Sequence, residues 1–346
     1  MPDDRTLVSE LGTALGMLGA ATPAAALAGG PGPLEVEPAT WERLVALHRD
    51  GAHAEVLQRA FANGRAFLAS PDALRGRRPA LVEWTGGRRP PGDEVAPVDL
   101  RVDHVYLVSC KYLSRAIANA SPARIFDGLL ATTGSWDRTD WFEAVAPDEH
   151  RRFYRACRDV AGLADLPDEP SALSSADRRR LRACLPARRL PDGDAAAAYR
   201  DLCDAVSARS AERWRRRLAD GAERLRLARR LLRIGNATYF LLGADERGPL
   251  RLRVADAWEW HRHHRLTGLP VCAAGAGQPQ VDWTIELAGP GGRRVDVHGH
   301  VEIRWSHGRF AQPPEAKVYV DTPAGELPGY TALADGEDPA QLALWA

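Results

Sequence analysis

Lysine is almost absent from this sequence: among its 46 lysine and arginine residues, only Lys111 and Lys317 are lysines. An ammonium group is compact and can shift its pKa, whereas a guanidinium group is planar, bulky and permanently charged. In a chain that uses arginine wherever a positive charge suffices, a remaining lysine indicates a position that arginine does not fill. Lys111 and Lys317 are therefore the first candidates for functional residues.

Paired cysteines and long hydrophobic runs are also missing. The five cysteines are scattered without C-x-x-C spacing, which argues against a disulfide framework or a zinc site and predicts reduced thiols. The first residues, Pro2-Asp3-Asp4, are acidic where a secretory signal needs positive charge. The Ala/Leu/Gly run that follows is too interrupted to span a membrane. We therefore expect a cytoplasmic protein with no membrane partner.

The sequence has no excess of charge of either sign, because 46 basic residues are matched by 46 acidic ones. Net charge alone thus gives no indication of a nucleic-acid partner. The distribution is uneven, however: residues 151–265 contain 26 lysine and arginine residues against 16 aspartate and glutamate residues. The middle third of the chain is therefore basic and its flanks are acidic.

The most specific local pattern surrounds Lys111. Apolar residues alternate with charged ones over residues 98–103, and a second run, residues 105–112, is rich in β-branched and aromatic residues. This pattern predicts two strands joined by a tight turn. Ser109 and Lys111 then share one face of the second strand. A helix follows, because Ser121 and Pro122 are typical of a helix start.

The position of Asp99 depends on the length of the turn. A two-residue turn would pair position 99 with position 108 and direct Asp99 to the face opposite Lys111. A loop with an odd number of residues, or a β-bulge, would bring Asp99 beside Ser109 and Lys111. A shared site for these three side chains therefore requires such an irregularity.

An aspartate, a hairpin, a lysine at the end of the second strand and a following helix together resemble the PD-(D/E)XK nuclease superfamily, over residues 50–131. The resemblance implies a restriction-endonuclease-like αβββαβ core within a mixed α and β protein (α+β or α/β). It also implies metal-dependent phosphodiester hydrolysis. In that chemistry Asp99 and a second carboxylate bind Mg²⁺ or Mn²⁺, while Lys111 orients or activates the attacking water.

Position 109 departs from the family pattern, because Ser109 stands where the family has an acidic residue. Some restriction enzymes of the superfamily have Ser-x-Lys here and supply the second carboxylate from the following helix, where Asp127 lies in this sequence. Glu83, in an apolar strand, and Glu55, on a preceding helix, are the other candidates. The expected catalytic residues are Asp99, Ser109, Lys111, Asp127 and Glu83, and the expected metal ligands are Asp99, Asp127 and Glu83.

The order of patterns along the chain predicts four consecutive regions. Residues 1–35 form a short helix and an Ala/Pro/Gly linker, and residues 36–135 form the nuclease-like core. Residues 136–235 form an arginine-rich helical region. From residue 236 to residue 346 the period changes to two, which predicts a separate antiparallel β domain.

Basic and aromatic residues in the last two regions are candidates for contact with DNA. A helix over residues 207–234 carries arginine on most of its surface, and residues 258–265 combine tryptophans with basic side chains. The helix is equally consistent with a solvated face that pairs with the acidic flanks of the same protein. The expected nucleic-acid contacts are Arg213, Arg216, Arg217, Arg224, Arg230, Trp260, His263 and Lys317.

Two further patterns lie in the C-terminal strands. In the run His298–Glu302 two histidines and a glutamate alternate on one strand face, a spacing that suits a transition metal. No further ligand is indicated, so a half-exposed strand face explains this pattern better. Glu315 and Lys317, with Asp296 upstream, form a second Asp…Glu-x-Lys motif, but no helix follows it. This motif ranks behind the one at Lys111.

These observations favour a metal-dependent nuclease that acts on DNA in restriction or other anti-phage defence. It would work as a homodimer or with other subunits of a defence system, a role that rests on the resemblance. The alternative is a catalytically inactive protein of the same fold that binds nucleic acid or assembles a defence complex, which Ser109 favours. A third alternative is a protein-interaction scaffold that uses its ten tryptophans.

Overall fold

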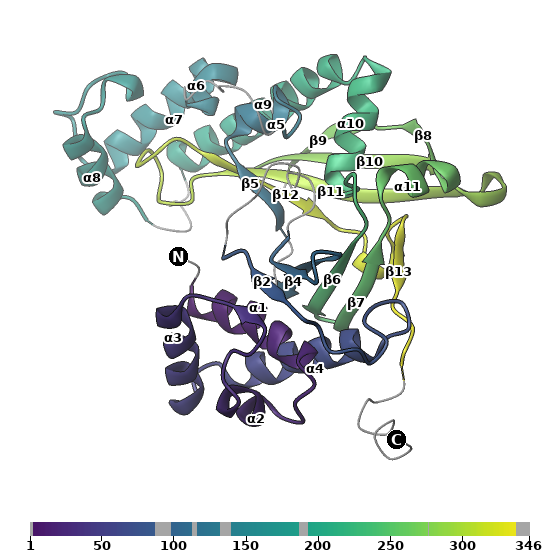
Figure 1. Ribbon diagram of the computed structural model, residues 1–346. Coiled ribbons are helices and arrows are strands. Elements are labelled where there is room, and N and C mark those ends of the chain that lie inside the picture. The colour runs from purple at the N-terminus through teal and green to yellow at the C-terminus, as the bar shows by residue number, and fades with distance from the viewer. Residues whose placement is uncertain are drawn as a thin grey trace, which may run out of the picture. The chain divides into compact units, whose positions relative to one another are not determined.

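The structure, a computed structural model, describes residues 3–86, 98–112, 116–131, 140–186, 193–275 and 277–336 of the 346-residue chain. The chain forms two compact units, each assembled from segments that are not adjacent in sequence. Unit 1 contains Met1–Ser114, Leu232–His264 and Pro323–Ala346, and unit 2 contains Arg115–Leu231 and Arg265–Thr322. Each unit combines helices with a β-sheet, so the protein is of the α+β class (Figure 1).

The sheet of unit 1 has seven strands in the order β1-β2-β3-β4-β6-β7-β13. These strands are β1 (Leu34–Glu35), β2 (Val82–Trp84), β3 (Leu100–Val102), β4 (Tyr106–Tyr112), β6 (Tyr239–Asp245), β7 (Gly248–Val254) and β13 (Tyr330–Ala332). β2, β3 and β4 form an antiparallel meander, whereas β6 pairs with β4 in parallel and β7 returns antiparallel to β6. The chain therefore leaves the sheet after β4, passes through unit 2 and re-enters beside β4.

Five helices accompany this sheet in the described residues: α1 (Asp4–Met17), α2 (Pro23–Ala28), α3 (Pro38–Arg49), α4 (Ala54–Ala69) and α11 (Ala257–His263). α1 begins where Asp3 accepts a hydrogen bond from the Thr6 amide, as expected of an N-cap aspartate. The apolar faces of α1 and α4 pack against the sheet. The buried core includes Leu11, Leu15, Leu57, Phe61, Phe67, Val82, Leu100 and Val108.

α1 and α4 cross in direct backbone contact, side by side in Figure 1. A Cβ atom at Gly16 would lie 2.1 Å from the Phe61 carbonyl oxygen, and one at Gly64 would lie 2.0 Å from the Thr13 carbonyl oxygen. No side chain fits at either position without moving the helices apart. α4 runs unbroken through Asn63 and Gly64, and Gly64 permits the close crossing.

Gly64→Ala is expected to lower the free energy of unfolding by about 3 kcal/mol, because the added methyl group overlaps the backbone of α1. Urea denaturation followed by circular dichroism measures this change. Gly221→Ala is the matched control, since a Cβ there meets nothing closer than the Arg224 side chain at 3.6 Å. The control should be neutral or slightly stabilising, because alanine is the better helix former. Equal effects of the two substitutions would contradict the close crossing.

Unit 2 has a six-stranded sheet in the order β5-β12-β11-β10-β8, with β9 also paired to β10. Its strands are β5 (Ala116–Ala120), β8 (Arg265–Gly268), β9 (Val271–Gly275), β10 (Pro279–Ala288), β11 (Arg294–Arg304) and β12 (Glu315–Val320). Its helices are α5 (Pro122–Phe126), α6 (Trp141–Val145), α7 (Pro147–Val160), α8 (Ser175–Cys184), α9 (Asp194–Arg217) and α10 (Gly221–Leu231).

One face of this sheet is apolar and the other is polar. Burial alternates strictly along β10, where Val281, Trp283, Ile285 and Leu287 are buried. α9 packs over β9 and β10. The period-two pattern of the sequence is therefore explained by one buried and one polar sheet face.

The two units differ from the four consecutive regions expected from the sequence. β6, β7 and β13 belong to the sheet of unit 1, whereas β8 to β12 join β5 in the sheet of unit 2. Alternation of apolar and polar residues with a period of two predicts a strand. It does not predict which sheet the strand joins, because strands of both sheets show the same alternation. The single helix expected over residues 207–234 is divided into α9 and α10, since Asp220 caps a new helix at the Ala222 amide.

Within the described residues, no helix is both long enough and apolar enough to cross a membrane.

Candidate active site

The hairpin around Lys111 has the odd loop that a shared site requires. The register of β3 and β4 pairs Val102 with Tyr106 and Leu100 with Val108, which leaves a loop of three residues. Asp103 and His104 in this loop have φ values of 50° and 57°, in the left-handed region. Continuing the register by one step places residue 99 opposite residue 109.

Asp99 is fixed at the point where β3 begins. Its amide donates to the Val108 carbonyl oxygen (2.9 Å), and its carbonyl oxygen accepts from the Thr85 amide (3.0 Å). Its carboxylate oxygen Oδ2 accepts a hydrogen bond from the Cys110 amide at 2.6 Å and lies 3.4 Å from the Ser109 hydroxyl. The Asp99 carboxylate thus accepts the hydrogen bond that a backbone carbonyl of a neighbouring strand would otherwise accept from the Cys110 amide. Cys110 directly precedes Lys111 on β4.

Glu10, which no sequence pattern indicated as a site residue, lies close to this hairpin. It projects from α1, is only 7% exposed, and its Oε2 accepts a hydrogen bond from the Trp84 indole at 2.7 Å. Burial, and next the negative charge of Asp99, raise the pKa of Glu10 to about 7, whereas the positive charge of Lys111 opposes that rise. Glu10, Asp99 and Lys111 therefore form one electrostatic cluster.

Cys110, which lies between Ser109 and Lys111, is affected by the same charges. Burial raises the pKa of the Cys110 thiol well above its usual value, and the charges of Asp99 and then Glu10 raise it further. A thiol in this environment stays protonated and is a poor nucleophile. The chemistry available at this position is therefore that of carboxylates and an ammonium group, not that of a thiolate.

The other predicted carboxylates lie elsewhere. Glu83 is on β2, and its carboxylate faces His104 Nδ1 at 3.2 Å, at the loop end of the hairpin. Glu55, on α4, is exposed and pairs with Arg59 at 2.8 Å. Neither contact directs the carboxylate toward the Asp99 end of the strand.

Asp127 belongs to unit 2 and follows the short helix α5, which begins at Ser121 as the sequence predicts. Its two carboxylate oxygens accept hydrogen bonds from Nε and Nη2 of Arg213, at 2.5 and 2.9 Å. This bidentate pair anchors the segment after α5 to α9. Asp127 and Arg213, predicted respectively as a metal ligand and a DNA contact, are thus engaged with each other.

Several other predicted DNA contacts are also engaged within the protein. Arg230 donates to the Leu129 carbonyl oxygen at 2.6 Å, and Arg216 lies 3.8 Å from Glu212. Arg217 is exposed at the end of α9, and Arg224 is half-buried on α10. The basic face of these helices is therefore used in part to hold unit 2 together.

Most of the segment over residues 258–265, which combines tryptophans with basic side chains, lies in helix α11. Trp260 is buried, at 1% exposure, so its ring is not accessible for stacking on a base. Trp258 is 70% exposed, and the Arg262 guanidinium lies 4.9 Å from its ring centroid. His263 is exposed on the same helix. The exposed aromatic side chain of this segment is therefore Trp258.

The two C-terminal patterns do not assemble as metal sites in the described residues. On β11, His300 Nδ1 contacts Asp321 at 2.8 Å, and His298 Nδ1 contacts Thr284 at 3.2 Å. Lys317 pairs with Glu302 across β11 and β12, whereas Asp296 lies beyond the last paired residues of these strands. The second Asp…Glu-x-Lys motif is therefore spread along the sheet.

No group of three or more histidine, cysteine, aspartate or glutamate side chains suited to a metal ion occurs in the described part of the chain. Mg²⁺ needs fewer protein ligands, since one or two carboxylates and several waters usually hold it. Asp99 and Glu10 are the candidate pair of carboxyl groups here, because their charges interact. Burial, and next the negative charge of Asp99, raise the pKa of Glu10, and a bound cation would offset the repulsion between the two charges.

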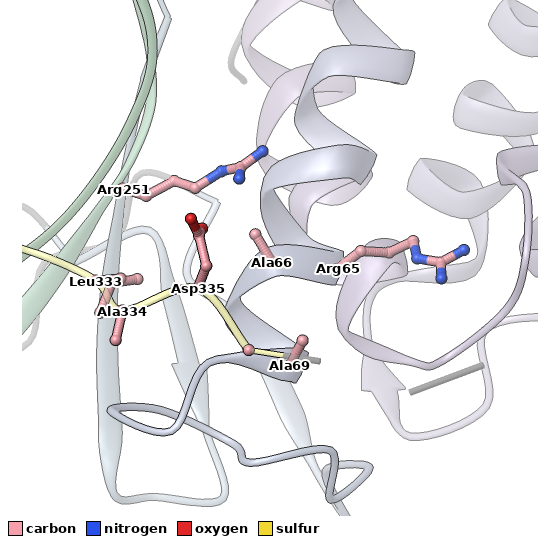
Figure 2. A pocket seen from close by; sticks show the side chains of 8 residues that line it. Arg65, Ala66, Ala69, Arg251, Leu333, Ala334 and Asp335 are labelled. Carbon is pink, nitrogen blue, oxygen red and sulfur yellow. The ribbon is translucent and has the colours of Figure 1, made fainter. Parts of the chain in front are cut away.

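A separate pocket of about 200 Å³ lies in unit 1 between α4, β7 and the segment that follows β13. Figure 2 shows the Asp335 carboxylate directed toward the Arg251 side chain, while Arg65 points away from both. Arg251 Nε donates a hydrogen bond to the Asn63 side-chain oxygen at 3.0 Å. None of the predicted site residues lines this pocket.

Comparison of the chain with protein-family models, with curated proteins and with solved structures finds no match.

Proposed function

We propose that unit 1 is a Mg²⁺-dependent nuclease that hydrolyses phosphodiester bonds of DNA. The observation that carries this proposal is the electrostatic cluster of Asp99, Glu10 and Lys111 at the start of β3. Its members come from a helix and two adjacent strands. DNA as the substrate and a role in anti-phage defence come from the resemblance to the PD-(D/E)XK superfamily.

The topology of unit 1 supports the proposal. A helix, α4, precedes the antiparallel meander β2-β3-β4, and β6 then pairs with β4 in parallel. This order agrees with the αβββ part of the core that the resemblance implies, whereas the helices between β4 and β6 belong to unit 2. Asp99 precedes the second strand of the meander and Lys111 lies near the end of the third.

The chain's own groups have distinct tasks in this scheme. Asp99 and Glu10 would hold the cation, and the Cys110 amide and Trp84 indole orient the two carboxylates. A bound Mg²⁺ ion lowers the pKa of its water and neutralises phosphate charge. Lys111 supplies a fixed positive charge where negative charge develops on the phosphate.

The experiment is cleavage of supercoiled and linear DNA with Mg²⁺, Mn²⁺ or EDTA by the parent protein and by Lys111→Ala. We expect metal-dependent cleavage by the parent and a loss of at least about 100-fold in the variant, as for the removal of one transition-state stabiliser. Arg49→Ala is the matched control, because it removes one exposed positive charge at the end of α3 in the same unit. Equal activity of the two variants would contradict the role of Lys111.

A second candidate function is nucleic-acid binding without catalysis. The observation that favours it is Ser109, which is fully buried and lies 3.4 Å from the Asp99 carboxylate at the position where the family has an acidic residue. A site with one carboxylate fewer holds a cation less tightly. Salt-sensitive DNA binding without cleavage, by the parent and by both variants, would favour this function.

A further inference from the structure

A second pocket, of about 380 Å³, lies in unit 2 where α9 ends and α10 begins. The turn that precedes β9 forms its other wall. It is lined by Arg215, Leu218, Arg224, Leu269, Pro270 and Val271. The aliphatic side chains are largely buried, apart from the exposed Pro270, so they form an apolar floor beneath two guanidinium groups.

The two arginines are held differently. Arg215 Nε donates to the Val271 carbonyl oxygen at 3.1 Å, and its Nη1 donates to Glu212 at 2.9 Å, which fixes the guanidinium at the pocket edge. Arg224 is half-buried, and no residue of the described chain accepts a hydrogen bond from its guanidinium or pairs with it. A guanidinium group with no acceptor in the described protein is available to bind an anionic ligand.

The carboxylates around this pocket are already engaged. Glu212 pairs with the arginines of α9, Asp220 caps α10 through the Ala222 amide, and Glu223 pairs with Arg226. Two more exposed arginines, at positions 216 and 217, lie on the same end of α9. The pocket is therefore positively charged, which suits an anion with an apolar body.

We propose that this pocket binds one nucleotide of a nucleic-acid strand. The phosphate contacts Arg224 and Arg215, and the sugar or base lies on the Leu218–Leu269–Pro270 floor. A guanidinium matches the geometry of phosphate oxygens, and the pocket volume falls in the usual range for small ligands. The identity of the ligand as a nucleic acid rests on the proposed function. The location of the site rests on the two arginines and on the apolar residues that line this pocket.

The test is binding of a fluorescently labelled 20-nucleotide single strand and of its duplex, measured by polarisation in EDTA at several salt concentrations. Arg224→Ala is expected to weaken binding about tenfold and to reduce the slope of log K against log salt by about 1. Arg200→Ala is the matched control, because Arg200 is an exposed arginine on the same α9 far from the pocket in sequence. It should bind like the parent.

Pro270→Asp is a second variant, because it places a carboxylate in the pocket without removing a buried side chain. It should weaken binding at least as much as Arg224→Ala. Thermal unfolding of every variant shows whether the fold is retained. If Arg224→Ala and Pro270→Asp both bind like Arg200→Ala, the pocket assignment is overturned, even where metal-dependent cleavage is observed.

Because EDTA removes the cation that cleavage requires, binding in EDTA tests the nucleotide pocket independently of the proposed catalysis. Binding that depends on Arg224 in a protein that never cleaves DNA supports the nucleotide pocket and overturns the nuclease. A parent protein that binds neither probe at low salt overturns the pocket assignment together with both functions that involve nucleic acid.

Discussion

Asp99→Asn is expected to lower metal-dependent DNA cleavage by about 10³-fold, because a bound cation contributes several kcal/mol of transition-state stabilisation. The amide oxygen of asparagine can still accept the hydrogen bond from the Cys110 amide, so the hairpin should keep its structure. The substitution removes the negative charge of the side chain and keeps its size and shape. Initial rates of plasmid nicking over a range of Mg²⁺ concentrations measure the effect.

The control for Asp99→Asn is Asp50→Asn, at the exposed end of α3 in the same unit. It should leave the cleavage rate and the dependence on Mg²⁺ unchanged. DNA binding in EDTA should be equal in both variants, because Asp99 acts through the cation. Cleavage that survives Asp99→Asn at the parental rate would exclude this carboxylate from the site.

The β-hairpin around Lys111 was predictable because its alternation of apolar and charged residues specifies two strands. The register confirms both strands and pairs Leu100 with Val108. The loop length was the step that sequence left open, because Asp103 and His104 adopt left-handed conformations that non-glycine residues seldom take. The three-residue loop decides on which face of the sheet Asp99 lies.

Glu10 was missed because its helix was assigned to an N-terminal linker region. A signal was present: a single glutamate lies among the apolar residues of a helix whose every residue from Leu7 to Met17 is buried. A buried carboxyl group is costly unless it is hydrogen-bonded or paired with a charge, so such a residue is a candidate for a functional role. The crossing of α1 and α4 through Gly16 and Gly64 is a contact between distant segments that local patterns do not reveal.

The arginine-rich helices show a different limit of sequence patterns. Periodicity gives the position of a charge on a helix, but not whether a partner from another segment neutralises it. Arg213 is paired with Asp127 and Arg230 with a backbone carbonyl, whereas Arg224 has neither kind of partner in the described residues. The structure therefore distinguishes the arginines that hold unit 2 together from Arg224, which lines a pocket and has no such partner in the described residues.

Glu10→Gln is expected to stabilise the protein at pH 8 and to remove part of its pH dependence. Because burial and Asp99 raise the pKa of Glu10 from 4.5 to about 7, the folded state binds more protons than the unfolded state between these pH values. The parent therefore loses stability relative to the variant as the pH rises through this window. This pKa shift corresponds to a difference in the free energy of unfolding between variant and parent of at most about 3 kcal/mol at pH 8, and to no difference below pH 4.5.

The measurement is urea denaturation of both proteins from pH 4.5 to pH 8, with and without Mg²⁺. Taking the difference between the two proteins cancels other shifted groups, such as Asp140, whose pKa burial raises to about 6. Mg²⁺ should stabilise the parent at pH 8 more than the variant, because the cation offsets the repulsion between Glu10 and Asp99. Parallel stability curves for parent and variant, together with an equal response to Mg²⁺, would remove Glu10 from the proposed metal site.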